Sequence, residues 1–294
     1  MEWGISVLGL ILAGVALRDI FHTLWHPSGF GGIAGLAFRV VWRSVRLLPQ
    51  HSRHLAGPLG VVVTVASWTS LVVLGWMVVY WPHMPDGFHF GSPLKPEQSS
   101  DAVAALYLSL VTVTTLGFGD ISPADPVLRV LAPLQALVGF VLLTAAISWV
   151  LQMYPALGRR RALAGRLSIL RSQASEHVIE TGDPVVASRL LDSVADGVIQ
   201  VEVDFVQFAE SYYFVDRSQG PSLADTLPYA LDMADAGRRS GSPEVRLAGG
   251  VLAQAVETLV RRLDAAYLKD GGSVRQVLAS YATDHGSQVA PSVE

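Results

Sequence analysis

Apolar positions along the chain form two long uninterrupted stretches. No Lys, Arg, Asp or Glu occurs between Arg53 and Asp86, and none occurs between Arg129 and Arg159. A helix needs about 20 apolar residues to cross a bilayer, because the hydrocarbon core offers the backbone no hydrogen-bonding partner. The pattern therefore predicts two membrane-spanning helices. The first, over residues 59–81, is called the outer helix below, and the second, over residues 128–157, the inner helix.

A third apolar stretch, residues 3–25, is interrupted only by the adjacent pair Arg18 and Asp19. Its start, Met1-Glu2, lacks the basic segment of a secretory signal peptide. We therefore expect an N-terminal membrane helix within residues 1–26.

The linker over residues 27–56 has a helical period. Seven apolar positions share one side of this helix: Ile33, Leu36, Ala37, Val40, Val41, Leu47 and Leu48. Arg39, Arg43 and Arg46 share the other. This pattern predicts an amphipathic helix on the inner membrane surface, with an ordinary helix packed on protein as the alternative.

Residues 158–294 have the period of amphipathic helices, interrupted by clusters rich in Gly, Pro and Ser. Asp183 before Pro184 and Ser242 before Pro243 are typical of helix N-caps. We expect four or five helices and no sheet here, with Phe205, Phe208 and Tyr212 in a core or a subunit interface. The predicted fold class is an all-α membrane protein with a C-terminal helical domain.

The charges predict the topology. The linker carries Arg39, Arg43, Arg46 and Arg53 without an acidic residue, and residues 159–161 are all Arg. Both regions are therefore expected in the cytoplasm. Residues 82–127 hold one base, Lys95, against five acidic side chains, and are expected outside. The chain is thus predicted to be a multi-pass plasma-membrane protein with a cytoplasmic C-terminal domain.

Composition excludes several classes of function. The net charge of -4 argues against nucleic-acid binding, and the chain has no cysteine for disulfides or thiolate chemistry. No motif of a hydrolase, a phosphate-binding loop or a dinucleotide-binding loop occurs. We therefore expect no enzyme and no cofactor. The first apolar segment also lacks the regular arginines of a voltage sensor.

A shorter apolar helix is predicted over residues 101–114, with Ser99, Ser100 or Asp101 as its N-cap. It is too short to span a bilayer, so the chain must enter the membrane and turn back. Irregular backbone at membrane depth is tolerated only inside protein or along a water-filled path.

The segment that follows suits cation binding through backbone carbonyls. Stacked carbonyl rings can replace the hydration shell of a potassium ion. The carbonyls must then all point to one axis, which requires positive φ at some positions, and Gly117 and Gly119 accept such angles readily. Thr115 adds a carbonyl and a hydroxyl, and Asp120 adds negative charge at the outer mouth.

Residues 112–120, Thr-Val-Thr-Thr-Leu-Gly-Phe-Gly-Asp, resemble the filter of the potassium-channel pore family, whose common form is Thr-Val-Gly-Tyr-Gly. The resemblance extends over about residues 59–154. Leu116 and Phe118 depart from the common form, and Phe118 lacks the aromatic hydroxyl. Many simple bacterial members carry an acidic residue behind the filter where Val111 stands, so Asp120 is expected to lack that partner.

The resemblance implies a potassium-selective homotetramer in the lipid membrane. Its selectivity filter would comprise Thr115, Leu116, Gly117, Phe118 and Gly119, with K+ as the permeant ion and no other metal. A non-conducting sensor or scaffold and a weakly selective cation channel are the alternatives. Residues 158–294 would assemble the tetramer or regulate its gate, with no ligand or protein partner identified.

The inner helix carries the features of a gate. Pro133 and Gly139 are bending points, and Gly139 matches the family's hinge by resemblance, with close helix packing as the alternative. Thr144, Ser148 and Gln152 recur every fourth residue. This stripe is expected to line a water-filled cavity, or otherwise to form hydrogen bonds between helices.

Asp19, His22 and His26 fall on one face of the first membrane helix. They suggest a metal or proton site, or a hydrogen-bonded cluster at the membrane interface. The run Arg159 to Arg161 is expected to fix topology, with contact to anionic lipid as the second interpretation.

Overall fold

The structure, a computed structural model, describes residues 2–25, 31–91, 100–215 and 220–286. Contacts divide the chain into two compact units. The first, called the membrane unit below, comprises residues 1–40 and 59–151. The second, the C-terminal unit, comprises residues 41–58 and 152–294. The C-terminal unit thus includes part of the linker, which the sequence did not group with it.

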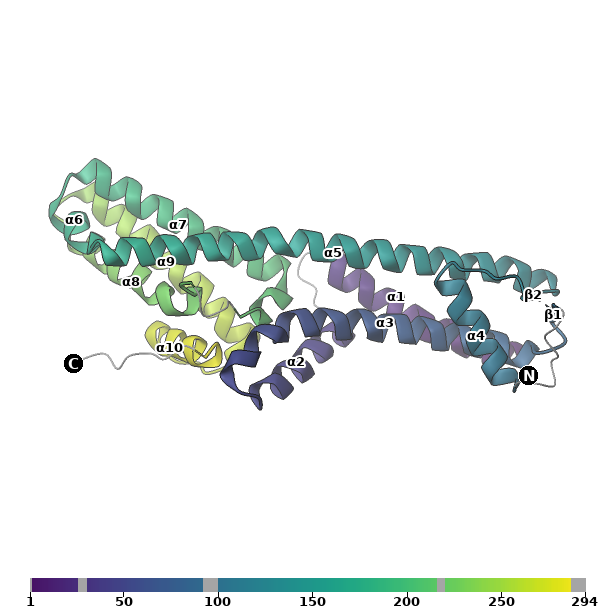
Figure 1. The fold of residues 1–294 in the computed structure, drawn as a ribbon. Helices are drawn as coiled ribbons and strands as arrows, with labels where there is room; N and C mark the ends of the chain where they lie inside the picture. The colour runs from purple at the N-terminus through teal and green to yellow at the C-terminus, as the bar shows by residue number, and fades with distance from the viewer. Residues whose placement is uncertain (1, 26–30, 92–99, 216–219, 287–294) are drawn as a thin grey trace. The chain divides into compact units, whose positions relative to one another are not determined.

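The membrane unit is built around helices that match the expected spans (Figure 1). Helix α1 covers Glu2–Leu24, α3 covers Ala56–Tyr80 and the short α4 covers Asp101–Val113. Helices α1, α3 and α5 (Pro126–Ser172) are each long and apolar enough to cross a membrane. These findings agree with an all-α membrane protein.

Helix α5 corrects one predicted boundary. It runs without interruption for 47 residues, from Pro126 to Ser172, rather than ending at Leu157. The expected end was taken from hydropathy, which marks where a helix leaves the lipid. The residues after Arg159 are mainly Arg, Ala and Leu, which are strong helix formers, so the helix continues.

Helices α1 and α3 cross at two glycines. A Cβ on Gly9 would overlap the carbonyl oxygen of Gly75, and one on Gly75 would crowd the backbone of Gly9 and Ala13. Ala13 and Ala16 are buried in the same seam. Small residues allow two membrane helices to approach closely, and α1 is therefore a packed part of the membrane unit.

Two short strands, which the sequence did not predict, lie near the predicted outer end of the membrane unit. Strand β1 (Phe88–Phe90) pairs antiparallel with β2 (Ile121–Pro123), and Phe90 lies opposite Ile121. Each strand has three residues, too few for an alternating pattern to be recognised. The pairing follows from tertiary contact: the buried Phe88 packs on Tyr80 at a ring distance of 5.7 Å.

The linker forms α2 (Gly32–Arg46) and a 3-10 helix, η1 (Gln50–Leu55), and a further 3-10 turn, η2 (Trp81–His83), follows α3. Ala37 and Val41 of α2 are buried, whereas Leu36 and Val40 are exposed. The apolar positions of this helix are therefore divided between a face on protein and an outward face.

Among the described residues of the C-terminal unit, five α-helices follow α5, within the predicted number. They are α6 (Ser175–Thr181), α7 (Pro184–Gln207), α8 (Leu223–Arg239), α9 (Pro243–Leu263) and α10 (Val274–Asp284). Shorter helical turns are η4 (Ala209–Tyr213) and η5 (Asp264–Leu268). No strand occurs here among the described residues. Asp183 caps α7 as predicted, whereas Ser242 precedes α9 without a side-chain bond.

The core of the C-terminal unit contains an aromatic cluster. Phe205, Phe208 and Tyr212 are buried, in agreement with the core interpretation. The Tyr212 ring stacks on Tyr267 with a centroid distance of 4.0 Å and meets the His285 ring at 4.9 Å. Burial raises the pKa of the Tyr212 phenol, and the nearby Asp284 raises it further.

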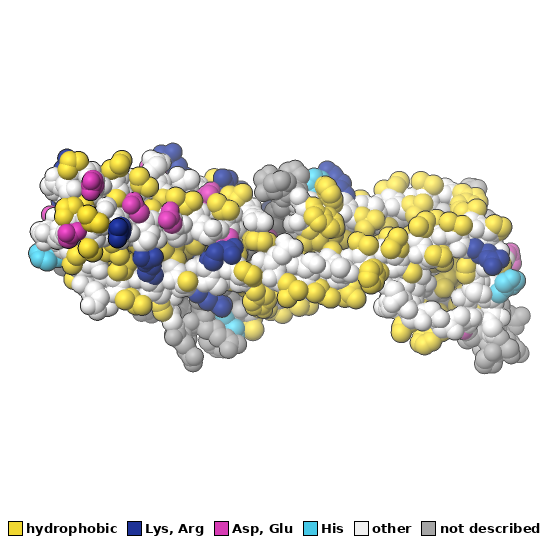
Figure 2. Space-filling view, turned by 90° about the horizontal axis from the view of Figure 1, so that it is seen from above, with side chains coloured by type: hydrophobic (Ala, Val, Ile, Leu, Met, Phe, Trp, Pro, Cys, Tyr) yellow, Lys and Arg dark blue, Asp and Glu magenta, His cyan; other side chains and the backbone are white. Residues whose placement is uncertain are grey.

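The surfaces of the two units differ in chemistry. On the face shown in Figure 2, the surface of the membrane unit is mainly hydrophobic, whereas most of the charged side chains lie over the C-terminal unit. This difference matches a unit solvated by lipid and a unit solvated by water.

Candidate functional site

Helix α4 is held in place by a buried polar network. The Gln135 side chain is fully buried, and its Nε2 donates to the carbonyl oxygen and the hydroxyl of Ser109 at 2.9 and 2.8 Å. Its Oε1 accepts from the Tyr80 hydroxyl at 2.7 Å. The Ser109 hydroxyl donates to the carbonyl of Val73 at 2.8 Å. Helices α3, α4 and α5 are thereby joined inside the membrane unit.

This network changes the interpretation of Tyr80. A tyrosine at the end of a membrane helix often lies at the lipid interface, but Tyr80 is fully buried, and the adjacent Trp81 is about half exposed. A buried tyrosine must satisfy its hydroxyl, and the Gln135 amide does so.

Gly139 lies against the C-terminal end of α4. A Cβ at this position would overlap the carbonyl oxygen of Val113, the last residue of α4. Close packing therefore requires a glycine here. Helix α5 continues through both Pro133 and Gly139 without a break, and bending at either position stays a prediction.

The loop after α4 has an alternating backbone. Thr115, Gly117 and Gly119 have positive φ angles of 58°, 53° and 76°, whereas Leu116 and Phe118 between them do not. The two glycines fit the expectation from sequence. A positive φ was not expected at Thr115, because the left-handed backbone conformation costs a residue with a side chain about 1–2 kcal/mol. An alternation of this kind points successive carbonyls to one side.

The loop is almost unsupported by its own chain. The amides of Thr115 and Leu116 donate back to carbonyls in the last turn of α4, each at 3.0 Å. Among the described residues, no hydrogen bond is accepted by a carbonyl of residues 115–119. Leu116 and Phe118 are 62% and 67% exposed, and a Cβ on Gly117 or Gly119 would meet nothing. The positive φ angles, and not a lack of space for a side chain, therefore explain why glycine occupies positions 117 and 119.

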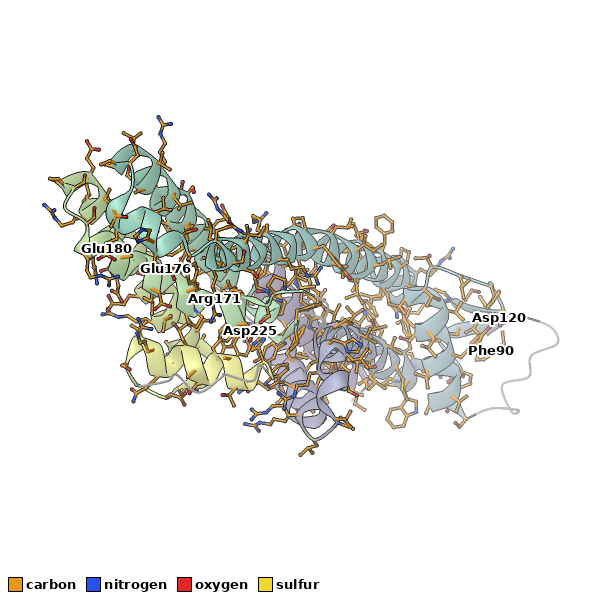
Figure 3. The ribbon with its side chains drawn as sticks, turned by 60° about the vertical axis from the view of Figure 1, so that its left-hand side comes forward. Phe90, Asp120, Arg171, Glu176, Glu180 and Asp225 are labelled. Carbon is orange, nitrogen blue, oxygen red and sulfur yellow. The ribbon has the colours of Figure 1, made fainter. Side chains whose placement is uncertain are left out.

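Asp120 lacks an acidic partner at position 111, as expected, but it has another partner on α4, Tyr107. Its Oδ2 accepts from the Tyr107 hydroxyl at 2.6 Å, and its Oδ1 accepts from the amide of Ile121. Tyr107 precedes Val111 by one helical turn, so it lies on the same side of α4. Asp120 lies beside strand β1 (Figure 3), and its carbonyl accepts from the Gly91 amide at 2.7 Å.

The polar stripe on α5 is accessible in the single chain. Thr144 and Gln152 are exposed and Ser148 is half-buried. The Thr144 hydroxyl donates to the carbonyl of Phe140, one turn earlier on the same helix, at 2.9 Å. This bond satisfies the Thr144 hydroxyl within α5. That the stripe lines a water-filled cavity stays a prediction.

Asp19 belongs to a hydrogen-bonded cluster. Its carboxylate accepts from the amides of Ile33 and Ala34 at 2.9 and 3.2 Å, and from the Trp68 indole at 2.8 Å. His26 lies outside the described residues. Within the described part of the chain, no group of three or more His, Asp or Glu is arranged to hold a metal ion.

Two of the three arginines after the membrane span hold the C-terminal unit together. Arg159 pairs with the Asp204 carboxylate at 2.5 and 2.9 Å. Arg160 is buried and donates to the carbonyls of Ser211 and Phe214 at 2.7 and 2.5 Å. These bonds give Arg159 and Arg160 a structural role that their sequence position did not reveal.

Sequence reasoning missed Tyr107, Ser109 and Gln135. Each is a polar residue within an apolar helical stretch, and that is the signal that could have found them. Their partners could not be inferred, because the pairs are up to 55 residues apart in the chain.

Part of the chain is similar to known ion channels. Residues 63–154 match the family model described as ion channel. The chain is 26% identical over 182 residues to the uncharacterized membrane protein YdjJ of Bacillus subtilis (strain 168). The match covers 60% of this chain and 52% of the relative, so the chain spans about half of that protein's length. No solved structure matches.

Proposed function

Because residues 63–154 form an ion-channel domain in a multi-pass membrane protein, we propose that the chain is one subunit of a potassium-selective channel. Potassium ions would pass through a filter formed by residues 115–119. The observation that carries this proposal is the alternating positive φ at Thr115, Gly117 and Gly119. Such a backbone presents a row of carbonyls that are unbonded within the described chain.

The row of carbonyls needs copies of the chain to enclose an ion. One chain supplies one side of a coordination shell, and dehydrating K+ requires a ring of oxygens. Four copies form such a ring in channels with this filter type. The exposure of Leu116 and Phe118 fits this arrangement, because a ring would cover them. We therefore propose a homotetramer.

The charges around the loop favour cations. Helix α4 ends at Val113, directly before the filter, so the negative end of its dipole lies at the filter's inner end. Asp120 adds a carboxylate at the outer end, where Tyr107 fixes its orientation. Both features lower the energy of a cation relative to an anion.

Selective flux is the direct test. Full-length protein in liposomes is expected to conduct K+ and not Na+, and Gly117→Ala is expected to abolish the K+ flux. Positive φ makes alanine unfavourable at position 117 although space is available. Gly250→Ala in α9, where space is also available, serves as the control. Equal flux of both ions would refute selectivity and favour the weakly selective cation channel.

The proposed cavity can be tested by chemical modification. The chain has no cysteine, so Thr144→Cys and Ser148→Cys each create a unique target. A water-soluble thiol reagent added from the cytoplasmic side is expected to modify both and to block flux. Ala145→Cys, on the buried side of α5, should stay unmodified. Modification of position 145 alone would assign the cavity to the opposite face.

We propose that the C-terminal unit lies in the cytoplasm and assembles or gates the tetramer. Helix α5 extends from the membrane unit into it without a break, so a rearrangement there can move the inner helix. The unit contains a cavity of about 510 Å³ whose lining includes Tyr154, Leu157 and Phe214. The mass of the full-length protein in detergent, measured by light scattering, is expected to equal four chains.

A further inference from the structure

Helix α2 presents an outward face that combines apolar and basic side chains. Leu36 and Val40 lie one turn apart and are 57% and 52% exposed. Arg39 and Arg43 are also exposed. They lie beside Leu36 and Val40 on the helix and not on the opposite side, as the sequence pattern had suggested. The helix contains no acidic residue. An exposed apolar edge flanked by guanidinium groups is typical of helices that lie in a membrane interface.

The position of α2 in the chain places it at the cytoplasmic membrane surface. It follows the end of α1 at Leu24 and precedes the start of α3 at Ala56. The chain leaves and re-enters the bilayer between these two ends, so both ends lie on the same side. The excess of arginine in this linker assigns that side to the cytoplasm.

Asp19 fixes which face of α2 points outward. The Asp19 carboxylate accepts from two amides in the first turn of α2, those of Ile33 and Ala34, and so caps that helix from α1. It also binds the indole of Trp68 in α3. A carboxylate at a helix N-terminus is stabilised by the helix dipole. These bonds tie the N-terminal end of α2 to the membrane unit.

The inward face of α2 packs on the other helices of the membrane unit. Phe38 is fully buried, and a Cβ on Gly60 of α3 would overlap its ring. The Phe38 ring also meets Trp149 of α5 at 6.3 Å, and Trp149 meets Trp68 at 5.5 Å. Leu36 and Val40 are therefore held on the opposite side, away from this packing.

We propose that the outward face of α2, formed by Leu36, Arg39, Val40 and Arg43, binds anionic phospholipids of the cytoplasmic leaflet. The apolar side chains enter the boundary of the acyl chains, and the guanidinium groups bind lipid phosphates. No ion pair between described residues involves Arg39 or Arg43, whereas Arg46, one turn further, pairs with Asp284 at 2.9 Å. Charge complementarity therefore selects anionic lipid over zwitterionic lipid.

A site-specific probe tests this surface without any measurement of ion flux. Because the chain has no cysteine, Val40→Cys accepts a single environment-sensitive fluorophore in the full-length protein. In vesicles of phosphatidylcholine with added phosphatidylglycerol, we expect a blue shift and quenching by lipids labelled near the glycerol. Leu247→Cys in α9, where the native side chain is 72% exposed, serves as the control and should show neither.

The arginines are tested by titrating phosphatidylglycerol. Replacement of both Arg39 and Arg43 by Gln is expected to raise the fraction needed for half of the spectral change by roughly 5-fold or more. The pair Arg166→Gln and Arg171→Gln, exposed on α5, is the charge-matched control and should leave it unchanged. Three results would each overturn the proposal: the same blue shift in vesicles with and without phosphatidylglycerol, the same rise in the required phosphatidylglycerol fraction in the control pair, or no quenching at position 40. Failure of potassium selectivity would affect none of these readouts.

Discussion

The two units satisfy their buried polar groups by different means. In the membrane unit, Tyr80, Ser109 and Gln135 form a neutral network of side-chain hydrogen bonds. The buried Asp19 carboxylate there also accepts from neutral donors, two amides and an indole. In the C-terminal unit, charged groups take this role: Arg159 pairs with Asp204, and Arg160 binds two carbonyls. Every ion pair recorded between described residues lies in the C-terminal unit.

The difference follows from the cost of removing charged groups from water. Charges that are desolvated in lipid are costly, and neutral polar groups that bond to each other avoid that cost. In the C-terminal unit one end of an ion pair can stay near the protein surface, as the 43% exposure of the Arg159 side chain shows. The comparison therefore predicts that a change of pH alters the stability of the C-terminal unit, whereas a change in packing alters the stability of the membrane unit.

The largest expected effect is that of Gly139→Ala in the membrane unit. The added Cβ would overlap the carbonyl of Val113, so α4 and α5 must separate. We expect a loss of about 3 kcal/mol or more in stability, together with loss of ion flux. Thermal unfolding of the full-length protein would measure it.

Gly165→Ala on the same helix is the control, because nothing lies within 4 Å of a Cβ there. It should be neutral or slightly stabilising, since alanine favours helix. If both substitutions had equal effects, tight packing at position 139 would be refuted.

The second effect is a loss of stability of the C-terminal unit in acid. Burial, together with the nearby positive charges of Arg160 and Arg53, lowers the pKa of His285 from about 6.5 to about 3. The unfolded chain therefore binds a proton that the folded unit refuses. The contribution of His285 to stability is complete above pH 6.5 and falls as the pH drops toward 3, by about 2 kcal/mol at pH 5.

Hydrogen exchange of the C-terminal unit between pH 7 and pH 5 is the measurement. His285→Phe keeps an aromatic ring without the titrating group, so its stability should depend less on pH. An unchanged pH dependence in this variant would show that other groups cause it. The Tyr80 network, which contains no group that titrates in this range, should respond little.

A third, smaller effect is expected from Gln135→Leu. The substitution leaves the buried Tyr80 hydroxyl and the Ser109 carbonyl without their partner, which costs about 1–2 kcal/mol. Thermal unfolding in detergent would measure the loss, and Gln152→Leu, at an exposed position, is the matched control. Equal losses would mean that the network adds nothing to packing.

The smallest expected effect is that of Tyr107→Phe, beside the proposed filter. Tyr107→Phe removes only the hydroxyl that donates to Asp120 at 2.6 Å. The lost hydrogen bond contributes about 1 kcal/mol to holding Asp120 in place. We therefore expect the ratio of K+ to Na+ flux to fall by roughly 5-fold, with little change in stability. Tyr154→Phe, an exposed tyrosine on α5, should leave the ratio unchanged. An unaltered ratio in Tyr107→Phe would show that the hydroxyl of Tyr107 does not support the proposed filter.

Prediction from sequence worked where a physical rule acts locally. Two uncharged stretches required membrane helices, and both occur as α3 and α5. Gly117 and Gly119 at alternate positions indicated positive φ, which both have. The same rule failed for Thr115, because a threonine carries no signal for an angle that only the surrounding loop imposes. The end of α5 was also misplaced, because hydropathy measures solvent and not helix length.

The sequence by itself determined the membrane class, the apolar helices and the positive φ of Gly117 and Gly119, since each depends on residues close together in the chain. Tertiary structure alone decided that Tyr107 braces Asp120, that Gln135 joins three helices and that Asp19 caps α2. In each case a polar group must find a partner once it leaves water. The partner is chosen by the fold, which brings together residues that the chain keeps apart.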